Sequence, residues 1–159
     1  MNKEKHDLII GVGNILLSDD GIGIHIIRKM EEDNVIDHAE YLDMGTSSME
    51  LGYYIDDNIR KMVIIDSIKT EEKPGTIFLL RPEDLVSKKR QDFSLHQLKL
   101  IDTLKLISLD RDFPDTIIVG IAPYDIKTFS DKLSPVLEDN YKSVYNNVVK
   151  IIRDFLENK

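Results

Sequence analysis

Short, almost continuous apolar runs alternate along the chain with segments whose apolar residues recur at helical spacing. The runs cover residues 8–12, 62–65 and 117–121, and each has the length of a strand buried on both faces, as in a parallel sheet. Helical spacing appears over 22–30 and again over 137–155. Strands that alternate with helices predict an α/β protein, a three-layer α/β/α sandwich.

Two further strands complete the predicted sheet. One is a short run over 41–43, and the other covers 76–80 after the Lys-Pro-Gly turn at 73–75. No helix separates the strand over 62–65 from the one over 76–80, so the latter is predicted to be antiparallel. We therefore expect a five-stranded, mostly parallel sheet in a single domain over residues 1–159.

Capping residues predict where three helices begin. Ser47 with Glu50 three residues later is typical of a capping box that opens a short helix. Ser94 is placed to cap a helix over about 95–109. Ser134, followed directly by proline, predicts the start of the last helix, because proline is favoured at the first helical position.

Composition and charge narrow the classes of function. The formal net charge of -8 argues against a protein that binds nucleic acid non-specifically. There is no cysteine, so any protein-supplied metal ligand comes from His, Asp, Glu or a backbone carbonyl. The apolar runs are of strand length, far short of the roughly 20 residues of a membrane span. We expect a cytoplasmic protein that contacts neither nucleic acid nor membrane.

The glycines that follow the first predicted strand suggest a nucleotide-binding turn. The segment 11–14 reads Gly-Val-Gly-Asn, but Leu16 stands where the dinucleotide fingerprint needs its third glycine. A pyrophosphate at the following helix would meet Asp19 and Asp20 instead of free backbone amides. A non-catalytic nucleotide-binding module is therefore the weaker alternative.

Three residues able to carry chemistry lie at the ends of predicted elements. Asp20 starts a helix, and the positive end of a helix favours an ionised carboxylate. The plain alternative is that Asp19 or Ser18 caps this helix and that Asp20 only adds charge at its start. Asp66 ends a buried strand, where it is either satisfied by neighbouring amides or displayed in a cleft. His96 lies just inside a helix. Together, two carboxylates and one imidazole offer two oxygen ligands and one nitrogen ligand, a set that suits nickel or zinc.

The other histidines have weaker claims as ligands: His6, His25 and His38.

The segment 11–23 resembles the signature of the hydrogenase maturation peptidases, G-x-G-N-x-L-x-x-D-[DE]-G-x-G, which is long and specific. Further matches follow in the order of that family, so that the resemblance spans roughly residues 7–150. They are the segments 43–46, 64–68, 74–76, 95–98, 119–123 and 133–135.

This resemblance implies an endopeptidase that removes the C-terminal extension of a nickel-loaded [NiFe] hydrogenase large-subunit precursor. Members bind nickel or a surrogate through an acid of the first motif, an aspartate after the third strand and a histidine, which here are Asp20, Asp66 and His96. The precursor supplies the nickel, and zinc or cadmium could occupy the same ligands. The family carries an aspartic-type label, but we expect Asp20 and Asp66 to act through metal-directed cleavage.

The chain departs from the family pattern in the loop after the second strand. Asp43 is followed by methionine where many members have Asp-Gly-Gly-Thr, and Ala122 replaces an acid found in some members. We expect Asp43, Gly45 and Thr46, with the polar segment 86–92, to select the substrate. The expected partner is the precursor, and the free protein is expected to be a monomer. A homologue that only sequesters metal is a further alternative.

Overall fold

The structure, a computed structural model, describes residues 4–86, 93–110 and 113–158. Its centre is a 5-stranded sheet in the order β2-β1-β3-β5-β4. Among the described strands, only β4 runs antiparallel to its neighbour, β5, so the predicted mostly parallel sheet is confirmed. The strands are β1 (His6–Val12), β2 (Ala39–Gly45), β3 (Ile59–Ser67), β4 (Ile77–Leu80) and β5 (Asp115–Ile121).

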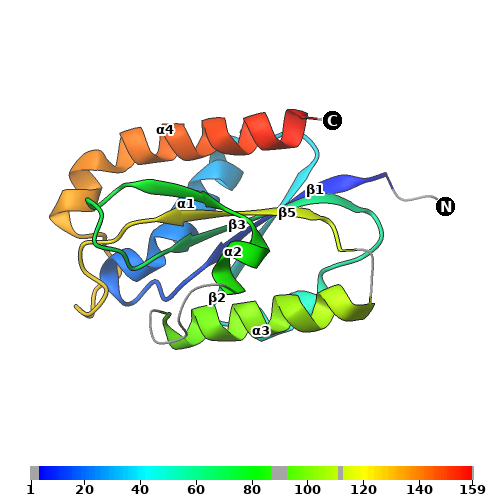
Figure 1. The fold of residues 1–159 in the computed structure, drawn as a ribbon. Coiled ribbons are helices and arrows are strands. Elements are labelled where there is room, and N and C mark those ends of the chain that lie inside the picture. The colour runs from blue at the N-terminus through cyan, green and yellow to red at the C-terminus, as the bar shows by residue number, and fades with distance from the viewer. Residues whose placement is uncertain (1–3, 87–92, 111–112, 159) are drawn as a thin grey trace.

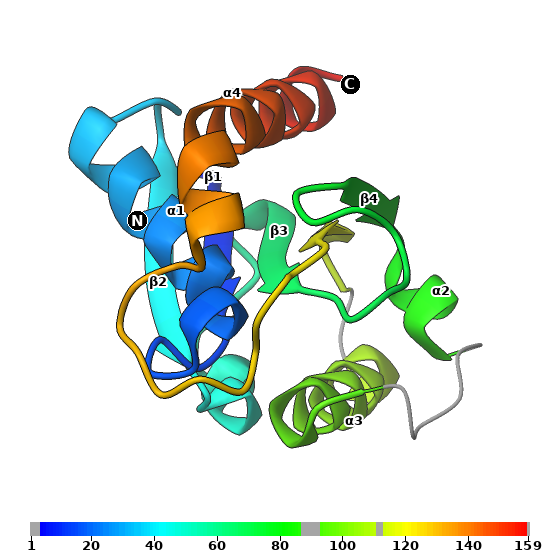
Figure 2. The same ribbon diagram turned by 90° about the vertical axis from the view of Figure 1, so that its left-hand side faces the viewer.

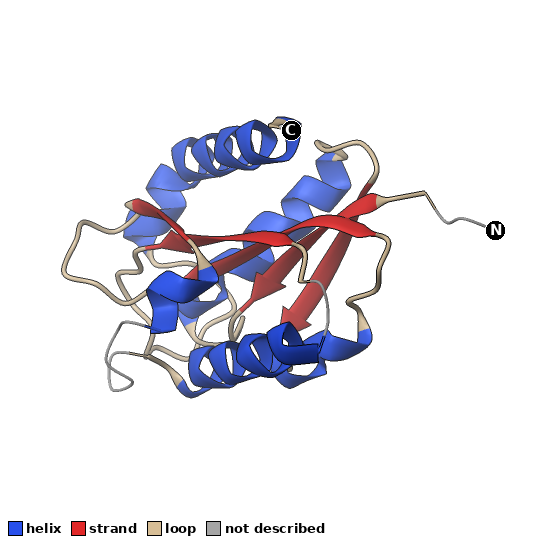
Figure 3. Ribbon diagram, turned by 45° about the vertical axis from the view of Figure 1, so that its right-hand side comes forward, coloured by secondary structure: helices blue, strands red, loops and turns tan. Residues whose placement is uncertain are grey.

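Helices cover both faces of this sheet, which confirms the three-layer arrangement (Figures 1, 2 and 3). One face carries α1 (Ile22–Asp33) and α4 (Pro135–Glu157), and the short 3-10 helix η1 (Ser18–Gly21) leads into α1. The other face carries the 3-10 helix η2 (Ser48–Tyr53), α2 (Pro82–Val86) and α3 (Leu95–Asp110). Helix α2 was not predicted, because five residues are too few to show a helical period.

The middle of each central strand is apolar because it contributes to two cores. In β3, Val63 and Ile65 pack toward α1 and α4, while Met62 and Ile64 pack toward α3, and all four are fully buried. Burying a side chain of this size contributes about 1.5–3 kcal/mol relative to exposure. Because side chains along the strand alternate between these two buried faces, residues 62–65 include no polar position.

Two of the predicted helix starts are confirmed by side-chain capping. In α3, the Ser94 hydroxyl accepts from the Gln97 amide at 3.4 Å, and Gln97 Oε1 accepts from the Ser94 amide at 2.9 Å. In α4, the Ser134 hydroxyl accepts from the Leu137 amide at 3.4 Å. Each bond satisfies an amide that the helix itself leaves without a partner.

The other two predicted caps are wrong. Ser47 precedes η2 but makes no side-chain cap bond; its ψ of 36° is outside the extended region that a capping residue needs. Helix α1 begins at Ile22 after Gly21, also without a side-chain cap, so neither Ser18 nor Asp19 caps it. The side chain of Asp19 is engaged elsewhere, as described below.

Helix α1 passes directly over β1 and β3, and Gly23 makes this close packing possible. A Cβ atom at position 23 would lie 2.3 Å from the Ile65 carbonyl oxygen and 2.8 Å from the Val12 carbonyl oxygen. Both neighbours are backbone atoms of the central strands and cannot move aside. The last glycine of the 11–23 motif is therefore required by packing.

We expect Gly23→Ala to lower the free energy of unfolding by about 3 kcal/mol, the upper end of overpacking costs. Alanine favours a helix over glycine by about 1 kcal/mol, but the backbone overlap outweighs that gain. Urea denaturation would measure the change. Gly52→Ala is the matched control, because the nearest atom to its Cβ would be 3.7 Å away. Equal stability of the two variants would contradict this account of the packing.

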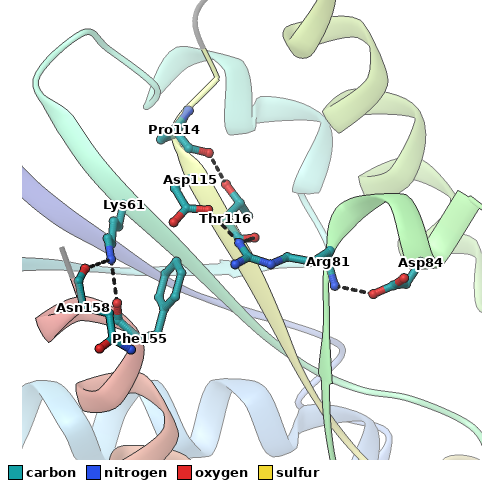
Figure 4. Close-up of polar contacts among 8 residues, drawn as sticks. All are labelled: Lys61, Arg81, Asp84, Pro114, Asp115, Thr116, Phe155 and Asn158. Carbon is teal, nitrogen blue, oxygen red and sulfur yellow. Dashed lines mark hydrogen bonds and ion pairs between the residues drawn. The ribbon is translucent and has the colours of Figure 1, made fainter.

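Polar contacts hold the end of the sheet at which β3 and β5 begin, opposite the carboxyl ends of the parallel strands (Figure 4). Lys61 Nζ donates to the carbonyl oxygens of Phe155 and Asn158, at 2.6 and 2.5 Å. A cation at these carbonyls also suits the negative end of α4. Arg81 Nη1 donates to Asp115 Oδ1 at 2.6 Å and so joins β4 to β5. These contacts are structural.

Candidate active site

The topology of the sheet has its switch point at the carboxyl ends of β1 and β3. The chain leaves β1 for β2 on one side and then returns to β3 on the other side of β1. Ligands of parallel α/β sheets bind where the order reverses in this way. The residues after β1 lead to Asp20, and Asp66 lies next to the last residue of β3. In Figure 2 these strand ends face the viewer.

Asp20 is buried and tied to the ends of both strands. Asp20 is only 5% exposed. Its Oδ2 accepts from the backbone amide of Asn14 at 3.0 Å, and its Oδ1 accepts from the Ser67 hydroxyl at 3.0 Å. Hydrogen bonds donated to a carboxylate favour its ionised form. The bond from Ser67 thus holds Asp20 beside Ser67, the residue that follows Asp66.

Asp66 and Asp20 converge on the turn that contains Gly13. A Cβ atom at position 13 would lie 2.1 Å from the Asp20 carbonyl oxygen and 3.6 Å from Asp66 Oδ1. Gly13 also has a φ of +139°, which L side chains rarely adopt. Glycine is therefore needed for both backbone conformation and space, and the structure brings these two predicted site residues together.

A mainly apolar pocket adjoins Asp66 under the first turns of α3. Asp66 is only 2% exposed, so its carboxylate lies in a region of low polarity. An ionised carboxylate attracts a cation more strongly there than in water. The pocket is lined by Asp66, Ile68, Leu85, Phe93, Gln97, Leu100, Ile101 and Ile118.

The third predicted ligand, His96, lies in the first turn of α3, but its side chain is outside the described part of the structure. The adjacent Gln97 donates from Nε2 to the Ser67 carbonyl oxygen, so this end of α3 lies against the carboxyl end of β3. Among the side chains that the structure describes, no group of three or more His, Asp or Glu could hold a metal ion. The three-ligand set, which includes His96, stays a prediction.

Asp19 has a role that the sequence did not predict. It is fully buried, and its Oδ2 accepts from the amides of Tyr124 and Asp125 at 2.9 and 2.8 Å and from the Ser134 hydroxyl at 2.8 Å. Its Oδ1 accepts from the Ser134 amide at 2.7 Å. Asp19 therefore holds the segment between β5 and α4 against the residues that precede Asp20.

The predicted substrate loop lies beside the same turn. The Gly13 amide donates to the Gly45 carbonyl oxygen at 2.9 Å. Asp43 forms an ion pair with Arg28 at 2.8 Å, and its Oδ1 accepts from the Gly45 amide at 3.1 Å. Thr46 is exposed. Asp43 thus shapes the loop, while the role of Asp43, Gly45 and Thr46 in selecting substrate stays a prediction.

The two departures from the family pattern are both buried. Met44 is 7% exposed and belongs to the core on the α3 face. Ala122 is fully buried, and its amide donates to the Thr76 carbonyl oxygen at 2.9 Å. The other segment predicted to select the substrate, 86–92, lies outside the described residues from 87 onward.

The remaining histidines do not join the site. His6 Nε2 lies 3.2 Å from Glu40 Oε2 at the amino end of β1. His38 is exposed in a connector, with a φ of +59°. His25 lies in α1, with its Nε2 buried and without a hydrogen-bond partner among the described residues.

Burial lowers the pKa of His25 below 6.5, and the nearby Arg28 charge acts in the same direction. As the pH falls through about 6.5, the unfolded chain binds this proton first, so the free energy of unfolding should decrease. We expect His25→Leu to lose less stability than the wild type between about pH 7.5 and pH 5.5. Urea denaturation at both pH values measures this, and equal losses would contradict it.

The fold and the two carboxylates define an α/β protein with an acidic site at the switch point of a parallel sheet. Comparison with known proteins narrows this class. Residues 24–151 match the family described as hydrogenase maturation protease. The chain is 33% identical over 152 residues to the hydrogenase 2 maturation protease of Escherichia coli, with 92% of this chain and 90% of the relative covered.

Solved structures give the same result. The hydrogenase maturating endopeptidase HybD from E. coli superposes with a TM-score of 0.78 and 31% identity, covering 94% of this chain and 93% of that one. The [NiFe] hydrogenase maturation protease HybD from Thermococcus kodakarensis gives a TM-score of 0.72 and 26% identity, covering 92% and 98%. The chain belongs to the hydrogenase maturation protease family and is therefore a hydrolase.

No helix in the described ranges is long and apolar enough to span a membrane.

Proposed function

We propose that the protein is the endopeptidase that removes the C-terminal extension from the nickel-loaded large-subunit precursor of a [NiFe] hydrogenase. The observation that supports this most directly is the convergence of Asp20 and Asp66 on the turn at Gly13. The convergence occurs in a chain 33% identical to a hydrogenase 2 maturation protease. That the free protein is a monomer and acts in the cytoplasm stays an expectation.

In this proposal, the nickel is part of the substrate. Asp20, Asp66 and His96 would complete the coordination of the nickel that the precursor carries, and zinc or cadmium could take its place. Two carboxylates and an imidazole are donors that a borderline divalent metal accepts. The metal would place the scissile peptide bond against the protease and polarise its carbonyl or a water molecule.

The surroundings of Asp20 favour metal-directed cleavage over an aspartic-protease dyad. A dyad shares one proton between two carboxyl groups, so one of them must be protonated. Asp20 instead accepts an N–H from Asn14 and an O–H from Ser67, and both bonds favour its charged form. A charged Asp20 is suited to bind a cation.

The geometry does not favour the nucleotide-binding alternative. The backbone amide of Asn14, in the turn after β1 where a phosphate would bind, already donates to Asp20 Oδ2. A bound phosphate would also face the buried carboxylate of Asp20.

The proposed activity is tested by incubating the purified protein with nickel-loaded large-subunit precursors from several hydrogenase classes. Mass spectrometry should show one precursor losing the mass of its C-terminal extension. Intact precursors from every class would contradict the proposal. Titration with a labelled nucleotide would then test the alternative.

A further inference from the structure

The segment between β5 and α4 contains a stretch, residues 124–130, that we name the rim segment. It passes along the carboxyl ends of the parallel strands, next to the residues that follow β1 (Figure 2). Ser130 forms a parallel bridge with Leu17. The Ser18 amide donates to the Ser130 carbonyl oxygen and the Ser130 amide donates to the Leu16 carbonyl oxygen, both at 2.9 Å. The rim segment is thus fastened to the chain that leads directly to Asp20.

Two aspartates give the rim segment a defined shape. The buried Asp19 accepts from the amides of Tyr124 and Asp125, and its own amide donates to the Asp125 carbonyl oxygen at 2.9 Å. Asp125 Oδ1 accepts from the amides of Lys127 and Thr128, each at 2.9 Å. The bonds from Thr128 lower the pKa of Asp125 below its ordinary value, so this turn is held by an ionised carboxylate at neutral pH.

This well-held segment presents large apolar side chains to solvent. Tyr124 is 66% exposed and Phe129 is 79% exposed, and Leu16 on the adjoining turn is 45% exposed. Core packing does not explain side chains exposed to this degree. Aromatic side chains on a preorganised backbone are effective anchors in protein interfaces, because little conformational entropy is lost when a partner covers them.

We propose that the rim segment is the surface on which the precursor protein docks, with Tyr124, Phe129 and Leu16 packing against an apolar part of its folded surface next to the tail. This inference rests on the proposed function. The occupant is a protein because the family cleaves a protein, and the rim segment is bonded to residues 16–19, directly beside Asp20. A peptide bond that reaches Asp20 and Asp66 therefore comes from a chain that lies against this surface.

Asp19 is the positioning residue of this surface. Its carboxylate is fully buried, and among the described residues it accepts four hydrogen bonds, from Tyr124, Asp125 and Ser134. It orients the rim segment relative to the neighbouring Asp20.

The test is a kinetic comparison of wild-type protein with the double variant Tyr124→Ser, Phe129→Ser on a precursor that the wild type cleaves. We expect KM for the precursor to rise about tenfold to thirtyfold, with the rate at saturating precursor changed by less than about twofold. The melting temperature should stay at the wild-type value, because both side chains are exposed. Binding of the same precursor should weaken by a similar factor.

The matched control is Leu106→Ser, Leu109→Ser, which removes two side chains of 67% and 79% exposure from the last turns of α3. These turns lie toward the amino ends of the strands, away from the site (Figure 1). An unchanged KM in the rim variant, an equal rise in the control, or a loss confined to the saturated rate would overturn the docking surface while leaving the proposed function intact. A wild type that cleaves and binds no precursor would overturn both.

Discussion

Replacing Asp66 with asparagine should reduce the rate of precursor processing by about a thousandfold or more. Asparagine has nearly the same shape but lacks the negative charge that a metal ligand or catalytic carboxylate needs. Asp66 is 2% exposed, so the variant also removes a buried charge. We therefore expect its thermal stability to equal or exceed that of the wild type, which separates lost chemistry from lost folding.

Processing of a purified precursor, followed by mass spectrometry, measures this effect. Asp115→Asn is the matched control, because Asp115 is an exposed carboxylate at the amino end of the neighbouring strand and should leave processing unchanged. If Asp66→Asn processed the precursor at the wild-type rate, Asp66 would not be an active-site residue. The same variant is then tested on nickel-free and nickel-loaded precursor. An equal loss of processing rate with the two precursors would favour a proton-sharing dyad over metal-directed cleavage.

The second large effect concerns stability. We expect Asp19→Ala to lower the free energy of unfolding by about 4 kcal/mol. The change removes the acceptor of four hydrogen bonds from Tyr124, Asp125 and Ser134, in a fully buried place. A charged acceptor contributes more to each bond than a neutral one, and donors left buried without it cost about 1–3 kcal/mol each.

Urea denaturation of Asp19→Ala measures the loss. The control is Asp115→Ala, which breaks an ion pair whose two side chains are about half exposed and should cost less than about 1 kcal/mol. Equal stability of the two variants would contradict the conclusion that Asp19 holds the segment between β5 and α4 in place.

The strands and the last helix could be predicted because their signals are local and strong. Residues 62–65 are apolar without interruption, and the structure buries them on both faces of the central strand β3. Ser134 and the proline after it set the start of α4 within one residue. The cap at Ser47 failed because the backbone there is not extended, a property that the residue type alone does not determine.

The site was predictable in part. Asp20 and Asp66 were expected to meet because both follow parallel strands, whose carboxyl ends lie at one edge of the sheet. The role of Asp19 was not predictable, since its partners lie 105–115 residues away in the chain and are mostly backbone amides. The exposed Tyr124 and Phe129 carry no periodic signal either, so only the structure places them beside the site.

We expect the carboxylates of Asp20 and Asp66 and the imidazole of His96 to act on nickel that the precursor carries. The deciding measurement is the processing of one co-expressed precursor with and without nickel, by wild-type protein and by His96→Ala. The precursor should lose its extension only when nickel is present and His96 is intact. Processing at the wild-type rate without nickel, or by His96→Ala, would contradict this expectation.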